Sequence, residues 1–343
     1  MTACMNFVYE VRKRLSERSQ PKINPLRHLS PAIADSVAYL SSPEALESIR
    51  QNPYWPKWNS PWWHMALLHE MGLSGRIPNS AIAAMREALD TQFLHFFPVR
   101  EEELPPGKDM HRDVCCHCGL GTLHQILDSR GVAVLQEHPW IGDWYLKYGL
   151  SDGGFNCSPE ACRTGNPPSS IVGTIPILEA LLVSRERPLS ADLERVLDRG
   201  AECLISRELR KGSHPEEVLD EEDWLKPGFP RFYLYDVLRG LSFLVRWAEL
   251  RKRALPAQAV FEVVRHLSES CPEGQVTIRR DCTDGIRTLK RDKGENWSWP
   301  HPASRFRLLD EVSRVGEESP FLTSHWQRTL ERLETLAESG LLV

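Results

Sequence analysis

Cysteine and histidine residues gather in one segment of this chain. Cys115 and Cys118 form a C-x-x-C pair, and Cys157 opens a C-x4-C pair about 39 residues later. Thiolates in such closely spaced pairs share one tetrahedral zinc ion in many metal sites. His117, beside the first pair, is a candidate catalytic acid or base. The candidate zinc ligands are Cys115, Cys116, Cys118 and Cys157.

The same cysteines also have a purely structural interpretation. Free cysteine is among the most buried residue types and packs as a small apolar side chain. A helix that is covered on both sides needs small residues, and Cys118, Gly119 and Gly121 supply them. The sequence therefore leaves two alternatives open: a zinc site that activates a thiol or water, or cysteines that only pack.

Two charged residues lie three positions apart in the apolar stretch 232–251, namely Asp236 and Arg239. Burial of either charge would be costly unless it is paired, so an ion pair is one explanation. The other explanation is that Asp236 is a cavity acid with a shifted pKa. Asp236 is our candidate general acid or base, and Arg239 is a candidate substrate-binding residue.

Aromatic residues and histidines recur where apolar helical stretches are expected to begin. Aromatic ring faces attract cations, so a cavity that they line would suit an isoprenoid chain or a carbocation. The alternative is that they pack neighbouring repeats together. The candidate substrate-binding residues of this kind are Trp62, Trp63, His64, Tyr233, Tyr235, Trp299 and His301.

Apolar helical stretches alternate with amphipathic ones. Residues 171–183 are apolar nearly all round, whereas residues 191–209 place apolar residues at the i, i+3, i+4, i+7 spacing of a half-buried helix. The apolar stretches begin near residues 60, 114, 170 and 232, a period of about 54 to 62 residues. This repeat predicts an all-α protein, an α/α toroid of about five helical hairpins. The expected helix pairs are 62–72 with 79–97, 113–127 with 140–150, 169–183 with 191–209, 232–251 with 256–270, and 304–315 with 323–341.

We expect an N-terminal arm over residues 1–28 and a single toroid domain over residues 29–343. Residues 274–300 contain VTIRR and GIRTL on either side of a turn, which predicts a short β-hairpin. Ser169 and Ser190 stand where helix N-caps are needed.

The segment YGLSDGGFNC, residues 148–157, resembles the D-G-G-F turn of the prenyltransferase and squalene-cyclase repeat superfamily. In such a turn the glycines permit positive φ, Asp152 caps locally, and Phe155 fills the gap between repeats. Arg287 and Lys290 also match the R-x-x-K pair with which protein prenyltransferases hold diphosphate. The chain contains no D-x-D-D motif of the protonating terpene cyclases.

This resemblance implies an α/α toroid from a divergent member of the superfamily. It implies a small isoprenoid or other apolar substrate in the central cavity, with zinc as the expected cofactor. The alternatives are a zinc-dependent toroid enzyme that activates a thiol or water, and a non-catalytic toroid that binds a ligand or protein.

The composition limits the classes of protein that fit. Lys and Arg total 42 against 47 Asp and Glu, a formal net charge of −5. A general nucleic-acid binder would carry a basic excess, so we expect no nucleic-acid partner. The sequence has no apolar run of the roughly 18 residues that a membrane-spanning helix needs. We also expect no secretory leader, because residues 1–20 show no apolar stretch followed by a small-residue cleavage site. We therefore expect a cytoplasmic protein.

Overall fold

The computed structural model describes residues 26–54, 60–91, 102, 106, 117–157, 167–212, 222–232, 234–283, 287–291 and 297–343. This part of the chain is mostly helical, as the sequence predicts, with one two-stranded antiparallel sheet. No helix within these ranges is both long enough and apolar enough to cross a membrane.

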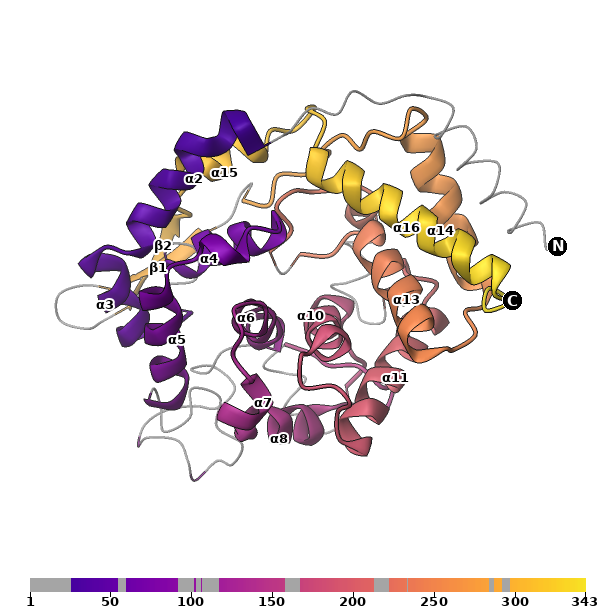
Figure 1. The fold of residues 1–343 in the computed structure, drawn as a ribbon, viewed down its shortest axis with the longest axis horizontal. Helices are drawn as coiled ribbons and strands as arrows, with labels where there is room; N and C mark the ends of the chain where they lie inside the picture. The colour runs from indigo at the N-terminus through magenta and orange to yellow at the C-terminus, as the bar shows by residue number, and fades with distance from the viewer. Residues whose placement is uncertain are drawn as a thin grey trace.

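The helices form two layers around the middle of the molecule (Figure 1). Each helix near the middle is followed along the chain by one or two helices that lie farther out. The inner helices are α4 (Trp62–Glu70), α6 (His117–Ser129), α10 (Ile171–Val183) and α13 (Val237–Arg251). The outer helices are α5 (Asn79–Thr91), α7 (Val134–Glu137), α8 (Pro139–Tyr148), α11 (Ala191–Ser206) and α14 (Ala257–Ser270).

Five further helical elements lie within the described residues. The helices α2 (Leu26–Leu40) and α3 (Pro43–Gln51) precede the first expected pair, and the sequence pattern did not predict them as helices. The C-terminal helices are α15 (Arg307–Val312), which packs on α2, and α16 (Pro320–Glu338), which packs on α13. A short 3-10 helix, η2 (Ser74–Arg76), links α4 to α5.

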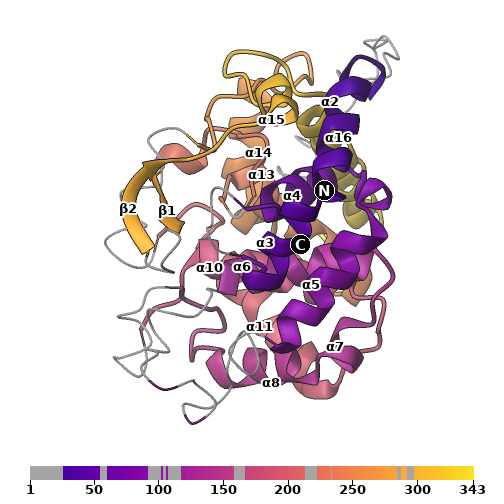
Figure 2. The ribbon, with the colours of Figure 1, turned by 90° about the vertical axis from the view of Figure 1, so that its left-hand side faces the viewer.

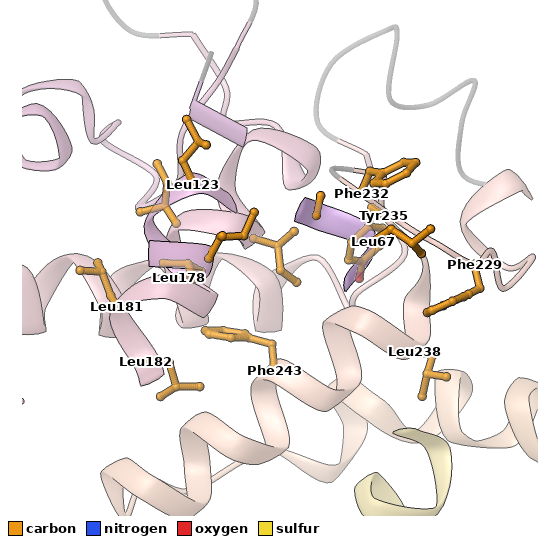
Figure 3. Packing of buried hydrophobic residues seen from close by; sticks show 14 of the residues in the cluster. Leu67, Leu123, Leu178, Leu181, Leu182, Phe229, Phe232, Tyr235, Leu238 and Phe243 are labelled. Carbon is orange, nitrogen blue, oxygen red and sulfur yellow. The ribbon is translucent and has the colours of Figure 1, made fainter. Parts of the chain in front are cut away.

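The core is built where the inner helices meet (Figure 3). Leu123 of α6, Leu178 and Leu181 of α10 and Phe243 of α13 are at most 3% exposed and belong to one cluster. Burial of such side chains contributes roughly 1.5–3 kcal/mol each. Because α10 is covered on both sides, it needs the all-round apolar surface that its sequence has.

A glycine lets α6 and α10 approach closely. A Cβ atom on Gly121 would lie 2.5 Å from the backbone nitrogen of Ile177, a distance that real Cβ atoms do not reach. The spacing of these two inner helices therefore depends on the absence of a side chain at this position.

The D-G-G-F turn has the geometry that the sequence predicts. Gly153 has φ +97°, and Asp152 accepts hydrogen bonds from the backbone N–H groups of Gly154 and Ser169. Phe155 is fully buried against Tyr145. Arg207 of the following repeat pairs with Asp152 at 2.9 Å, so the turn joins two helix pairs.

Serine side chains cap the beginnings of some of the helices. Ser190 caps α11 as expected, whereas the cap expected at Ser169 is made by the next residue, Ser170, on α10. The strands β1 (Arg287–Arg291) and β2 (Trp297–Pro302) project from one edge of the helical body (Figure 2). They lie C-terminal to the expected position, because VTIRR does not form a strand.

Candidate functional site

A polar cavity lies in the middle of the molecule. It has two overlapping lobes of about 400 and 540 Å³, a size suited to a small molecule. Side chains from α4, α6, α10, α13 and α16 line it, and these helices surround the middle in Figure 1. Among the described residues of its lining are five arginines and two glutamates, an excess of positive charge in a chain of net charge −5.

One wall of the cavity is an ion pair between inner helices. Arg239 of α13 donates two hydrogen bonds to the Glu179 carboxylate of α10, at 2.9 and 2.6 Å. Gln125 of α6 donates to the same carboxylate and to the carbonyl of Pro176. Three inner helices therefore hold these groups in place, and Arg239 has a partner already.

A second buried pair holds the start of α13. Arg231 donates two hydrogen bonds to Asp236, at 2.6 and 3.2 Å, and Asp236 also caps α13 by accepting from the backbone N–H of Arg239. Arg231 further donates to Nδ1 of His325, at 3.1 Å. Since arginine has no acceptor, Nδ1 must be unprotonated, and the neutral ring of His325 carries its proton on Nε2.

Glu70 lies at the C-terminal end of α4, on the cavity wall. Its carboxylate accepts backbone N–H bonds from Arg231, at 2.8 Å, and from Phe232. Burial raises the pKa of Glu70 to about 7, against the opposing influence of Arg239, Arg231 and the two N–H donors. A carboxyl group that titrates near neutrality is suited to general acid or base work.

The positive charges of the remaining cavity arginines are less well compensated by carboxylates. Arg328 and Arg332 lie one turn apart on α16, and Arg246 of α13 faces the same cavity. Burial and the nearby cations Arg332 and Arg328 lower the pKa of Arg246. Arg332 pairs with Glu249 at 3.4 Å, whereas neither Arg246 nor Arg328 forms an ion pair with a carboxylate in the described ranges.

This arrangement is suited to an oxyanion. Guanidinium groups present paired N–H donors that match carboxylate and phosphate oxygens. Burial also lowers the pKa of His69 and of His325 below the usual histidine range, so both rings stay neutral near pH 7. Part of the cavity wall is apolar, with Phe229 stacked on Phe321 at a ring distance of 4.9 Å.

The aromatic residues singled out from the sequence lie elsewhere. Trp62 and Trp63 begin α4 and are buried against Phe232, and Tyr235 donates to the carbonyl of Leu209. Trp62, Trp63 and Tyr235 do not line the central cavity. Trp299 and His301 belong to strand β2 rather than to a helix start, and Tyr233 lies outside the described residues.

His64 lines a separate cavity between α2, α4 and α15, together with Trp63. Its ring stacks on Phe306 at a centroid distance of 3.7 Å and contacts Tyr39. Burial lowers the pKa of His64 to about 4, so the ring is neutral near pH 7.

Part of the cysteine and histidine segment is brought together. The backbone N–H of Cys118, in the first turn of α6, lies 3.5 Å from Sγ of Cys157, and Nδ1 of His117 lies 3.0 Å from the carbonyl of Asn156. Cys115 and Cys116 lie outside the described residues. The two sequence segments therefore meet at one end of α6.

A different group of residues has the geometry to hold a metal ion. One ligand atom from each of His124, Asp128 and Glu186 lies within 4.8 Å of the other two. Nitrogen and carboxylate oxygen are common ligands of divalent transition metals. None of these three residues is among the candidates that the sequence pattern indicates.

Most of the residues that line the central cavity are also absent from the candidates that the sequence pattern indicates. Glu179 gave a visible signal, because it is the only charged residue in the apolar stretch 171–183. Arg328 and Arg332 gave none, since charged residues one turn apart are common on exposed helix faces.

The comparisons with known proteins add no assignment. No family model matches the chain, and no curated protein or solved structure shows a significant similarity to it.

Proposed function

We propose that the chain is an α/α toroid of the prenyltransferase and terpenoid-cyclase type whose central cavity binds a small molecule with an anionic head and an apolar body. The diphosphate ester of an isoprenoid has this chemistry. The observation that carries the proposal is the concentration of arginines around one cavity, where Arg246 and Arg328 have no carboxylate partner among the described residues. The alternation of inner and outer helices around that cavity supports the toroid.

In this proposal Arg246, Arg328 and Arg332 bind the anionic head, and the Nε2–H of His325 adds a neutral donor. Phe229 and Phe321 contact the apolar body of the substrate. Positive charge at the head stabilises a departing diphosphate, because preorganised donors act most strongly where negative charge develops. Glu70 is the group placed to transfer a proton at neutral pH. Asp236 instead positions Arg231 and the first turn of α13.

Isothermal titration calorimetry tests the proposal with geranyl diphosphate, inorganic diphosphate and geraniol. Geranyl diphosphate should bind most tightly, because it uses both the arginines and the apolar wall. Replacing Arg328 by Gln should weaken both diphosphates by about tenfold to a hundredfold, the loss of roughly 1.5–3 kcal/mol from a charged hydrogen bond. Arg314, exposed beside Glu317, provides the control variant Arg314→Gln. Equal binding of geraniol and geranyl diphosphate would refute the proposal.

The zinc-dependent toroid enzyme is a second proposal, favoured by the contact between Cys118 and Cys157. Zinc held by these thiolates would activate a thiol or water, with His117 as the acid or base. Zinc content of the Cys118→Ala, Cys157→Ala double variant tests it, since a site at these cysteines would lose its ion.

A further inference from the structure

The group formed by His124, Asp128 and Glu186 joins three parts of the fold. His124 and Asp128 lie one turn apart on α6, whereas Glu186 lies in the connection between α10 and α11. This connection also contacts the start of the outer helix α7, through Glu186 itself. The site is distinct from the central cavity, whose lining includes none of these three residues.

His124 presents a buried nitrogen to this group. The side chain is fully buried, and its Nδ1 lies 3.1 Å from the hydroxyl of Tyr145 on α8. Its Nε2 is also buried and has no hydrogen-bond partner in the part of the chain that the structure describes. An unsatisfied buried nitrogen costs about 1–3 kcal/mol. A metal ion would use the Nε2 lone pair, and the hydroxyl oxygen of Tyr145 would then accept a hydrogen bond from Nδ1–H. Most metal-bound histidines donate their second ring N–H to an oxygen acceptor in this way.

Backbone donors hold the two carboxylates in place. Asp128 Oδ1 accepts from the N–H of Arg185, at 2.9 Å. The two oxygens of Glu186 accept from the N–H groups of Leu135 and Gln136, at 2.7 and 2.8 Å. Each carboxylate oxygen has two lone pairs, so these bonds orient the ligands and leave a lone pair for an ion.

We propose that His124, Asp128 and Glu186 bind one divalent transition-metal ion of the zinc or manganese type, with water completing its coordination. One nitrogen and two carboxylate oxygens suit these ions, and both carboxylates are partly exposed, so the ion can enter from solvent. The ion links the end of α6, the start of α7 and the connection after α10. Because it binds the folded chain through residues that meet only there, it stabilises the fold.

Cobalt(II) is the probe for this site, added to untagged protein after removal of metals with a chelator. Equilibrium dialysis should give one Co²⁺ per chain at the group, with a visible spectrum that lacks thiolate charge-transfer absorption. Binding should fall at least tenfold in Asp128→Asn and in His124→Gln. The control is Asp143→Asn, an exposed carboxylate on α8, which should bind Co²⁺ as the unaltered chain does.

The Asp128→Asn variant keeps the test decisive if His124→Gln fails to fold, because the amide oxygen of Asn can still accept from Arg185. Added Co²⁺ should raise the Tm of the unaltered chain and of Asp143→Asn, and should leave the Tm of Asp128→Asn unchanged. Unchanged Co²⁺ affinity in Asp128→Asn would overturn the proposal. So would the absence of binding to the unaltered chain, or binding only with thiolate absorption, which would place the ion at the cysteines.

Discussion

The guanidinium of Arg239 on α13 holds the carboxylate of Glu179 on α10 through two hydrogen bonds of 2.9 and 2.6 Å. The Arg239 side chain is 7% exposed and that of Glu179 22% exposed. Arg239 also donates to the carbonyls of Phe232 and Leu234. One side chain therefore joins two inner helices and the loop before α13, and it shapes the wall of the cavity.

Removal of one partner of this ion pair should lower the free energy of unfolding far more than removal of both partners. Arg239→Met leaves a largely buried carboxylate without its counter-ion, and we expect it to lower the free energy of unfolding by about 3–5 kcal/mol. Urea unfolding monitored by circular dichroism measures the loss.

The double variant Arg239→Met, Glu179→Leu is the matched control. It should recover a large part of the stability, because no buried charge remains. Additive losses in the double variant would contradict the coupling between the two residues.

Sulfate binding should strengthen as the pH falls from 8 to 6. Glu70 has a pKa of about 7, so its protonation in this range removes a negative charge from the cavity wall. We expect an affinity increase of about fivefold, equivalent to roughly 1 kcal/mol. Sulfate is a suitable probe because its own charge does not change between these pH values, and calorimetry at several pH values measures the effect.

The variant Glu70→Gln should bind sulfate with little dependence on pH.

The raised pKa of Glu70 also predicts that the ligand-free fold loses stability as the pH rises from about 4.5 through about 7, since the folded state favours the protonated acid. A pH dependence that persists in Glu70→Gln would assign the titration to another group.

Gly121→Ala should separate α6 from α10. The new Cβ would meet the backbone of Ile177 at 2.5 Å, and backbone cannot rotate away. We expect a loss of about 1–3 kcal/mol, seen as a lower urea midpoint. Gly142→Ala in α8 is the matched control, because the atoms nearest to the new Cβ would be 3.8 Å away. Alanine has a higher helix propensity than glycine, so this variant should be as stable as the unaltered chain or slightly more stable.

Periodicity accounts for the parts of the fold that could be predicted. The contrast between the apolar stretch of α10 and the amphipathic stretch of α11 distinguishes an inner from an outer helix without any knowledge of the partners. The β-hairpin was displaced because VTIRR pairs with neither strand; Thr277 instead forms an isolated bridge with Glu318. A pairing between residues so far apart in the chain leaves no pattern in the sequence around either residue.

The site was harder to predict because its residues become neighbours only through the arrangement of helices. Asp236 was correctly selected as a buried charge, but its partner is Arg231 rather than Arg239, since it caps the helix that Arg239 belongs to. Trp62 and Trp63 have the composition of a ligand-binding surface and yet pack in the core. Charge on one face of a helix does not reveal whether that face meets solvent or a cavity, which is why Arg328 was missed.

The most direct test of the central cavity is diffraction from crystals soaked in tungstate, with data collected at the tungsten absorption edge. Tungstate has the tetrahedral oxyanion geometry of sulfate, and its anomalous signal locates it without ambiguity. The account predicts a peak within hydrogen-bond distance of the guanidinium groups of Arg246 and Arg328, absent in Arg328→Gln. Tungstate bound only at other positions, with the arginine cavity lacking a peak, would contradict the assignment of this cavity as an anion site.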